Sequence, residues 1–252
     1  MNIFSADVKK IKFFKSFLSV VKDIVIDITL VIAKNGISLT SLDSSKNILI
    51  HIELNSTDFN DYICLVDKLI ITTGSQNLYK IVSKISNKSN LNLCIKDEDY
   101  SNFNVQFLSL LVNNTLFKIK SNENPSTEYE IPLSNKKKHK TQVTMKSDDI
   151  YHVIKSMELI SENVEIHTQI DQITFNTSGE YAISNCSFPI HTVSIEMDKT
   201  IIPLSVLKIF TKSVTLTDDV TIEYGNGIPF LLSYKINDLG NFNFFYKNCQ
   251  SI

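Results

Sequence analysis

The feature that most constrains the fold is a short pattern that occurs twice, about half a chain apart. Lys80-Ile81-Val82-Ser83-Lys84 recurs as Lys208-Ile209-Phe210-Thr211-Lys212 in a chain of 252 residues. Each copy leads into a β-rich run, which is residues 91–95 after the first copy and 220–224 after the second. A period of half the chain is too long for a solenoid repeat, and it predicts a duplicated domain.

Four segments have the apolar spacing of amphipathic helices. The spacing predicts helices over Lys9–Ile24, Gln76–Ser86, Ser147–Ile160 and Pro203–Lys212. Ser147-Asp148-Asp149 predicts an N-cap and an acidic first turn for the third helix, and Pro203 suits the first turn of the fourth. Each predicted helix keeps its apolar residues on one face and carries lysine or histidine on the opposite face.

Alternating segments between these helices predict strands. Asp27–Ile32, a turn at Asn35-Gly36, and Ile37–Leu39 read as a hairpin, and Asn163–His167 with Ile173–Phe175 repeats that pattern. The order of helix, strand, hairpin, helix and strands therefore occurs twice.

The two copies are separated by a polar segment with Pro125 and Pro132, which predicts an extended linker. We therefore expect an N-terminal domain over residues 1–120, a connecting loop over 121–140 and a C-terminal domain over 141–252. The loop contains the basic run Lys136-Lys137-Lys138-His139-Lys140. This run is either a nuclear localisation patch or a solvated loop.

Charge and cysteine content limit the class of protein. The net charge is −2, so any contact with nucleic acid must come from lysines gathered on one face. All 25 basic residues are lysine, which disfavours sequence-specific reading of bases because that reading relies on the arginine fork. Four cysteines far apart predict buried thiols in a reducing compartment. The sequence also has no signal peptide and no apolar run of about 18 residues, so we expect neither secretion nor a membrane span.

No pattern in the chain predicts catalysis. Asp43 with Ser44 and Ser45 could suggest an acid and a nucleophile, but the five histidines are scattered at unrelated spacings. There is no P-loop, no dinucleotide-binding glycine motif, no metal-ligand cluster and no nucleophile elbow. We therefore expect no enzyme activity, no cofactor and no metal.

Several local strings carry a family resemblance. Gly36-Ile37-Ser38-Leu39-Thr40-Ser41-Leu42-Asp43-Ser44-Ser45 is similar to a first-domain signature in which a strand runs into a Met/Leu-Asp-Ser-Ser turn. The string from Pro229 to Ile236, followed by Asp238-Leu239-Gly240, is similar to a C-terminal strand pair, and Phe210-Thr211-Lys212 and Ile131-Pro132 match as well. Together, in this order, they resemble the proliferating cell nuclear antigen family of sliding clamps over about Lys9 to Tyr246.

The resemblance implies an α+β DNA-clamp fold of two similar domains, with sheets outside and lysine-bearing helices inside. Three subunits would close head to tail into a ring around duplex DNA, and the ring would act as a DNA polymerase processivity factor. A head-to-tail contact joins two different surfaces and closes only if the rotation is right. The strands expected to pair are Asn113–Lys120 of one subunit and Tyr181–Phe188 of the next.

Lysines on the inner helices would face the phosphates without sequence preference, which suits a ring that slides. The family often has further basic residues where this chain has Ser83 and Ser205. The residues expected to face DNA are Lys9, Lys12, Lys15, Lys22, Lys80, Lys84, Lys88, His152, Lys155, Lys208 and Lys212.

The resemblance also implies an apolar pocket under the connecting loop. This pocket would receive peptides of the form Gln-x-x-aliphatic-x-x-aromatic-aromatic from DNA polymerases, clamp loaders, flap endonucleases and ligases. The segment Tyr246–Cys249 departs from the family, which commonly has Ala-Pro there, and this affects the expected peptide preference. The residues expected to line the pocket are Leu42, Lys46, Leu49, Tyr129, Ile131, Pro132, Pro229, Phe244 and Phe245.

Two other functions remain open at the level of sequence. One is a clamp-like polymerase accessory or transcription factor that never closes into a ring. A measurement of the oligomeric mass would distinguish it from a ring-forming clamp. The other is a DNA-modifying enzyme with a lysine groove, which would need an acidic or metal site. The expected location is the nucleus, or a cytoplasmic replication site if the chain comes from a large DNA virus. The sequence leaves open a homotrimer or a place in a mixed ring.

Overall fold

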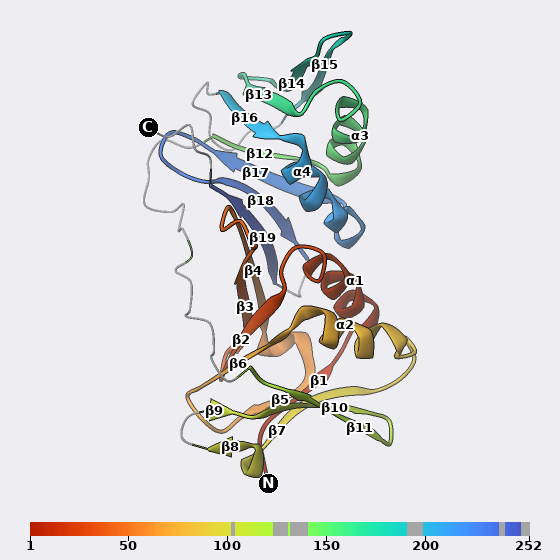
Figure 1. The fold of residues 1–252 in the computed structure, drawn as a ribbon, viewed down its shortest axis with the longest axis vertical. Helices are drawn as coiled ribbons and strands as arrows, with labels where there is room; N and C mark the ends of the chain where they lie inside the picture. The colour runs from red at the N-terminus through yellow and green to blue at the C-terminus, as the bar shows by residue number, and fades with distance from the viewer. Residues whose placement is uncertain (102–103, 123–130, 132–140, 191–198, 237–239, 248–252) are drawn as a thin grey trace. The chain divides into compact units, whose positions relative to one another are not determined.

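The structure is a computed structural model of the 252-residue chain (Figure 1). It describes residues 1–101, 104–122, 131, 141–190, 199–236 and 240–247. The chain divides into two compact units. The first unit comprises Met1–Glu130 with Ile236–Phe242, and the second comprises Ile131–Lys235 with Asn243–Ile252. The first unit thus includes a short segment from near the C-terminus, whereas the sequence predicted 1–120 alone. Most of the predicted connecting loop, 121–140, lies outside the described residues.

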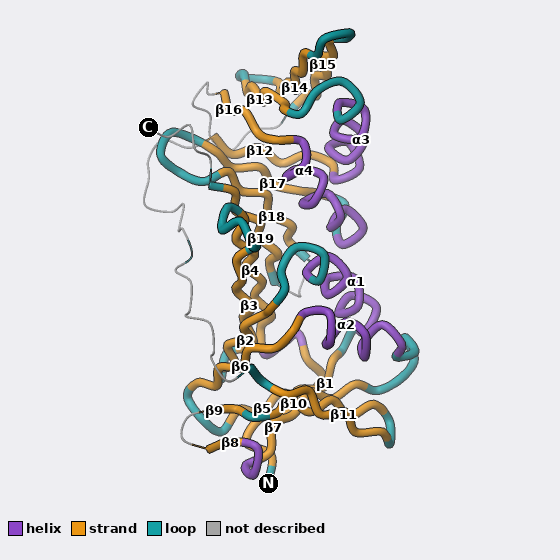
Figure 2. The backbone as a smooth tube through the Cα atoms, viewed as in Figure 1, coloured by secondary structure: helices purple, strands orange, loops and turns teal. Residues whose placement is uncertain are grey.

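The first unit contains two larger groups of strands, the two-stranded sheet β8-β9 and two helices. One sheet has the order β11-β10-β7-β1-β5, and a second group has the order β4-β3-β2-β6. Helices α1 and α2 pack against each other (Figures 1 and 2). The elements are β1 Asn2–Val8, α1 Ile11–Val21, β2 Asp27–Ala33, β3 Gly36–Leu42, β4 Ile48–Asn55, β5 Phe59–Cys64, β6 Lys68–Gly74, α2 Ser75–Lys84, β7 Leu91–Lys96, β8 Tyr100–Ser101, β9 Asn104–Val105, β10 Phe107–Val112 and β11 Thr115–Lys120, with 3₁₀ turns η1 Ser56–Asp58 and η2 Asp97–Asp99.

The second unit repeats this plan. One sheet has the order β15-β14-β13-β16, and α3 packs against α4. A second group has the order β12-β17-β18-β19, and β19 belongs to this unit from Asn243 onward. The elements are β12 Thr141–Lys146, α3 Ser147–Met157, β13 Asn163–Thr168, β14 Gln172–Ser178, β15 Ile183–Pro189, β16 Lys199–Pro203, α4 Leu204–Phe210, β17 Asp219–Tyr224, β18 Phe230–Lys235 and β19 Asn241–Tyr246, with the 3₁₀ turn η4 Thr211–Leu216. The repeated pattern of the sequence thus falls on α2 in one unit and on α4 with the start of η4 in the other.

The predicted hairpins form, and Gly36 of the first one allows β3 to lie close to β4. Strands β2 and β3 pair antiparallel, with Ala33 opposite Gly36. Gly36 has a φ of 149°, and a Cβ at this position would lie 2.1 Å from the Leu54 carbonyl oxygen of β4. Any side chain would therefore push β3 away from β4. In the second unit β13 and β14 pair in the same way, with Ile166 opposite Phe175.

The four predicted helices also form, with shorter bounds. Asp148 and Asp149 lie in the first turn of α3 as expected, but the expected cap is wrong. Lys146 occupies the N-cap position with an extended backbone, and the Ser147 hydroxyl is buried with no hydrogen-bond partner among the described residues. Pro203 likewise ends β16 and caps α4 rather than entering its first turn. In both cases the strand continues one residue further than the polar pattern indicated.

Apolar side chains between helices and strands form the core of each unit. In the first unit α1 and α2 contribute Phe14, Phe17, Leu18, Leu78 and Val82 to this core. The expectation of buried thiols holds for Cys94, whereas Cys64 and Cys186 are half-buried and Cys249 lies outside the described residues. No helix in the described ranges is long and apolar enough to cross a membrane.

Candidate DNA-facing and partner-binding surfaces

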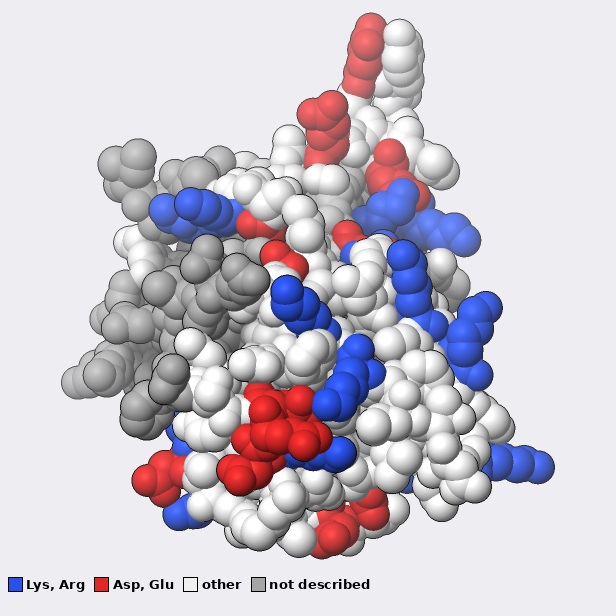
Figure 3. Space-filling view, turned by 60° about the horizontal axis from the view of Figure 1, so that its bottom comes forward, with Lys and Arg blue, Asp and Glu red and all other residues white. Residues whose placement is uncertain are grey.

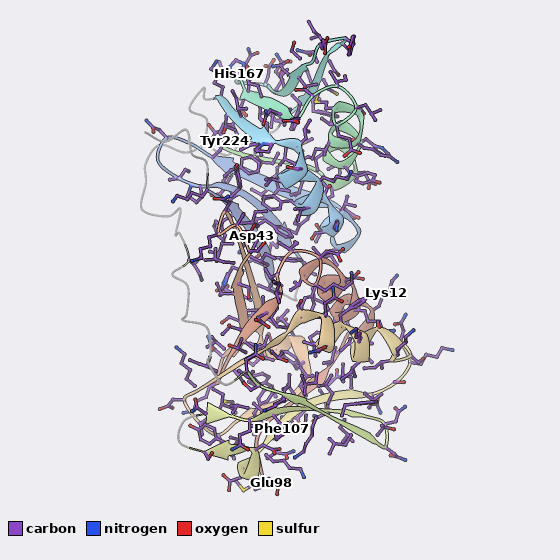
Figure 4. All side chains as sticks on the ribbon, viewed as in Figure 1. Lys12, Asp43, Glu98, Phe107, His167 and Tyr224 are labelled. Atoms are coloured by element: carbon purple, nitrogen blue, oxygen red, sulfur yellow. The ribbon has the colours of Figure 1, made fainter. Side chains whose placement is uncertain are left out.

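The predicted lysines of the first unit lie on α1 and α2 and beside them, since Lys9 precedes α1 and Lys88 follows α2. Lys9, Lys12, Lys80, Lys84 and Lys88 are exposed, and none forms an ion pair among the described residues. Figure 4 labels Lys12, which projects from α1 away from the strands. Because the two helices are adjacent, these ammonium groups form one cationic surface on the first unit. Such a surface attracts phosphates without reading bases.

Two further lysines of α1 contact α2 instead of projecting freely. The ammonium of Lys15 donates a hydrogen bond to the backbone carbonyl of Ile85, which caps the C-terminal end of α2. The ammonium of Lys22 lies 4.9 Å from the ring centroid of Tyr79 and pairs with Asp23. Both side chains are half-buried. The helical pattern placed both on the polar face, but their long stems fold back onto the neighbouring helix.

The predicted cationic residues of the second unit lie on and beside α3 and α4. His152, Lys155, Lys208 and Lys212 are exposed. Lys208 pairs with Glu158, the C-cap of α3, at 2.8 Å, and this ion pair is open to solvent on the lysine side. Lys155 lies 5.8 Å from the ring centroid of Tyr151 on its own helix.

Each unit also presents an edge strand. Strand β11 pairs only with β10, and β15 pairs only with β14, as far as the structure describes the chain. Large apolar side chains are exposed at both edges. Leu116 on β11 is 47% exposed, Ile183 on β15 is 80% exposed, and Tyr181 just before β15 is 92% exposed. Exposed apolar edges invite pairing with another strand.

The turn between β3 and β4 is organised by Asp43. Its carboxylate accepts hydrogen bonds from the backbone N–H groups of Asn47 and Ile48 at 2.9 and 2.8 Å and from the Ser45 hydroxyl at 2.5 Å. Partial burial alone would raise the pKa of Asp43, but these hydrogen bonds outweigh it and hold the pKa below its usual value. The turn places Lys46 in the left-handed region, with a φ of 58°. Asp43 thus acts structurally, as the anchor of a turn that carries one predicted pocket residue.

The remaining predicted pocket residues are distributed over both units. Leu42 ends β3 and Leu49 lies on β4, both in the first unit. Ile131, Pro229, Phe244 and Phe245 belong to the second unit, while Tyr129 and Pro132 lie outside the described residues. Phe244 is fully buried and stacks on Phe210, with ring centroids 4.8 Å apart. Phe245, the next residue of β19, is also buried, at 6% exposed, and its place in the pocket stays a prediction.

Charges of both signs lie close together on the face shown in Figure 3, where lysines and carboxylates are neighbours. The cationic helix surfaces therefore arise from placement rather than from a general excess of lysine. In the described part of the chain no group of three or more His, Cys, Asp or Glu residues could hold a metal ion.

Family models match both units. The model of the proliferating cell nuclear antigen N-terminal domain matches residues 3–119, and that of the C-terminal domain matches residues 134–249. The chain belongs to the proliferating cell nuclear antigen family. The proliferating cell nuclear antigen of Dictyostelium discoideum is 26% identical over 257 residues, which cover 96% of this chain and 98% of that protein. The crystal structure of the Entamoeba histolytica protein matches the fold with a TM-score of 0.86 at 17% identity, covering 98% of each chain.

The predicted family and DNA-clamp fold are therefore confirmed, and the protein is a sliding clamp and DNA polymerase processivity factor. The alternative of a clamp-like factor that does not form a ring is not favoured. Family membership supports DNA binding and contacts with replication proteins in general.

Sequence reasoning missed one ion pair close to an edge strand of this clamp. The Asp99 carboxylate accepts two hydrogen bonds from the Lys118 ammonium, at 2.8 and 3.1 Å. The two residues lie on different elements and follow no helical or strand period, so the sequence alone does not indicate the pair. It is recognised only from the burial of Asp99, in an Asp-Glu-Asp run that looks exposed.

Proposed function

We propose that the clamp acts as a homotrimeric ring that encircles duplex DNA. The observation that carries this proposal is the pair of edge strands. Strands β11 and β15 are of similar length, both are unpaired on one side within the described residues, and both expose large apolar side chains. Pairing β11 of one subunit with β15 of the next would bury these side chains and satisfy both edges.

The mass in solution tests the ring. Sedimentation at micromolar concentration is expected to give a species of about three times 28.6 kDa. A monomer whose mass does not change with concentration would contradict the ring. Co-assembly only with a second clamp protein would indicate a mixed ring instead.

We further propose that the exposed lysines of the four helices face the DNA in the ring. Lys12, Lys80, Lys84 and Lys155 combine exposure with the absence of an acidic partner among the described residues. Compact ammonium groups provide attraction that water and salt can exchange, which allows sliding. Lys15 and Lys22 contribute less, because each is held by a contact with α2.

We propose that replication proteins bind through peptides of the form Gln-x-x-aliphatic-x-x-aromatic-aromatic. The residues proposed for this binding are Leu42 and Leu49 of the first unit and Ile131, Pro229 and Phe245 of the second. The expected carriers of such peptides are DNA polymerase, clamp loader, flap endonuclease and ligase proteins, and the expected location is the nucleus, or a cytoplasmic replication site for a viral chain. The sequence departure at Tyr246–Cys249 leaves room for a peptide preference of its own.

Calorimetry with a Gln-x-x-Leu-x-x-Phe-Phe peptide tests the pocket. Truncation of a central anchor typically costs at least about 2 kcal/mol, or roughly 30-fold in affinity. Ile131→Ala with Phe245→Ala is therefore expected to abolish measurable heat while the oligomer persists. A wild-type protein that gives no heat with the peptide and no competition with a polymerase would contradict the pocket.

A further inference from the structure

Two neighbouring acidic residues of η2 have very different surroundings. The side chain of Asp99 is 6% exposed and receives both hydrogen bonds from Lys118. Glu98, which is labelled in Figure 4, forms an ion pair with Lys96 at 3.3 Å that is open to water on both sides. An exposed pair of this kind contributes little, whereas loss of one partner from a buried pair leaves a charge without compensation. Asp99 is therefore the more strongly constrained of these two carboxylates.

Lys118, the partner of Asp99, lies on β11, one of the two edge strands proposed to pair between subunits. Lys118 is the fourth residue of β11, opposite Ser109 of β10, and its neighbour Ile119 is buried in the core. The Lys118 ammonium also lies 5.3 Å from the ring centroid of Phe107, another residue labelled in Figure 4. The hydrogen bond from Lys118 to Asp99 raises the pKa of the Lys118 ammonium, which stays charged. Two elements, η2 and β10, thus hold this side chain against its own sheet.

An unrestrained lysine on an edge strand would have the opposite effect. Lysine at a sheet edge discourages pairing with another strand, because its charge must lose water when a second strand approaches. Its flexible four-carbon side chain also lets the ammonium group reach positions along the open edge of the strand. Asp99 removes that freedom and neutralises the charge, and it ties a strand with a single neighbour to the rest of the unit.

We propose that Asp99 is a positioning residue for subunit pairing, which keeps Lys118 on the face of its own sheet so that the edge of β11 stays open to β15 of the next subunit. The inference rests on the ring proposed above. It adds a determinant of assembly that lies outside both pairing strands.

Asp99→Asn and Glu98→Gln form a matched pair of variants, because they make the same chemical change at adjacent positions. The dissociation constant of the oligomer is measured for both by sedimentation over a range of concentrations. Asp99→Asn is expected to weaken association about tenfold, which corresponds to about 1.4 kcal/mol, and Glu98→Gln is expected to leave it unchanged. Amide hydrogen exchange in β11 is expected to quicken in the first variant only.

The double variant Asp99→Asn with Lys118→Met separates positioning from simple stability. It removes the ammonium group that Asp99 would no longer hold and keeps an apolar side chain of similar length. Association is therefore expected to return toward that of the wild type. A structural role alone would change the melting temperature of Asp99→Asn and of the double variant without changing association. If Asp99→Asn does not fold, the double variant decides the matter: strong association supports the proposal, and weak association overturns it.

Two results would overturn the inference for different reasons. An Asp99→Asn variant with a lower melting temperature and unchanged association would reduce the pair to a structural contact. A wild-type protein that remains monomeric would overturn the ring itself, and the inference with it.

Discussion

Lysine side chains connect the two helices of a pair in both units, but through different partners. In the first unit Lys15 bonds to a backbone carbonyl and Lys22 lies against an aromatic ring, and both side chains are half-buried. In the second unit Lys208 reaches Glu158 in an ion pair that water can enter. The contacts that Lys15 and Lys22 make with α2 use a neutral carbonyl and a neutral ring, whereas Lys208 reaches the other helix through a second charge. Lys15 and Lys22 are thus held by the neighbouring helix, while Lys12, Lys80 and Lys84 of the same unit stay exposed.

The largest difference is expected in stability. Lys15→Met is expected to lower the free energy of unfolding by about 2 kcal/mol, because it leaves the Ile85 carbonyl without its charged donor. Lys208→Met is expected to lower it by less than about 1 kcal/mol, since its partner is solvated. Urea unfolding of both variants measures the difference. Equal losses would remove the distinction between the two helix pairs.

A comparison of two turns sharpens the contrast between the units. The turn after β3 is built on the Asp43 carboxylate, whereas the turn of residues 225–228 before β18 closes through a backbone hydrogen bond at 3.4 Å. Asp43→Asn is expected to cost about 1.5 kcal/mol at pH 7, because hydrogen bonds to a charged acceptor are lost.

This loss has a defined pH dependence. The folded-state pKa of Asp43 lies below its usual value, so its contribution is complete above the ordinary carboxyl pKa of about 4 and disappears as the pH falls through the lowered pKa. The wild type and Asp43→Asn are therefore expected to converge in stability at strongly acidic pH. A gap of constant size from pH 7 downward would show that the carboxylate is not the source.

DNA binding is expected to separate free from anchored lysines within the first unit. Lys80→Ala with Lys84→Ala removes two exposed charges and is expected to weaken binding to duplex DNA roughly fivefold, with a salt slope about two units shallower. Lys15→Ala with Lys22→Ala is expected to change the slope less, since these ammonium groups already have partners. Binding isotherms at several salt concentrations give both slopes. A larger effect from the second pair would place Lys15 and Lys22 on the DNA.

The smallest expected effect concerns salt and stability. Raising the salt concentration is expected to erase the contribution of the Lys208–Glu158 pair, which is about 0.5 kcal/mol. The contact of Lys15 with the Ile85 carbonyl is expected to change less, because the acceptor is neutral and the lysine is half-buried. Thermal unfolding of Lys208→Met and Lys15→Met at low and high salt tests this. A similar salt response in both variants would contradict it.

Periodicity was sufficient to predict the repeat, the four helices and the hairpins, because each is encoded by neighbouring residues. Periodicity failed where the local structure depended on contacts between residues far apart in the sequence. The sequence could not show that Lys15 folds back to Ile85, since helical spacing fixes where a side chain starts and not where its long stem ends. The cap of α3 was misplaced because Ser147 is a good cap by type, while pairing of β12 with β17 keeps Lys146 in extended conformation and opposite Asp219. The pair of Asp99 and Lys118 joins two elements that only the folded sheet brings together.

The two edges of one chain are different surfaces, and this has a genetic consequence. A subunit with a damaged β15 and an intact β11 can still bind one neighbour. It therefore joins an assembly that cannot close into a ring. In the proposed ring of three, an equal mixture of damaged and normal subunits would leave only about one ring in eight fully normal. A substitution such as Ile183→Asp is therefore expected to be dominant in a cell that also makes the normal protein. Damage to both edges of the same chain would instead exclude it from assembly and leave the normal rings undisturbed.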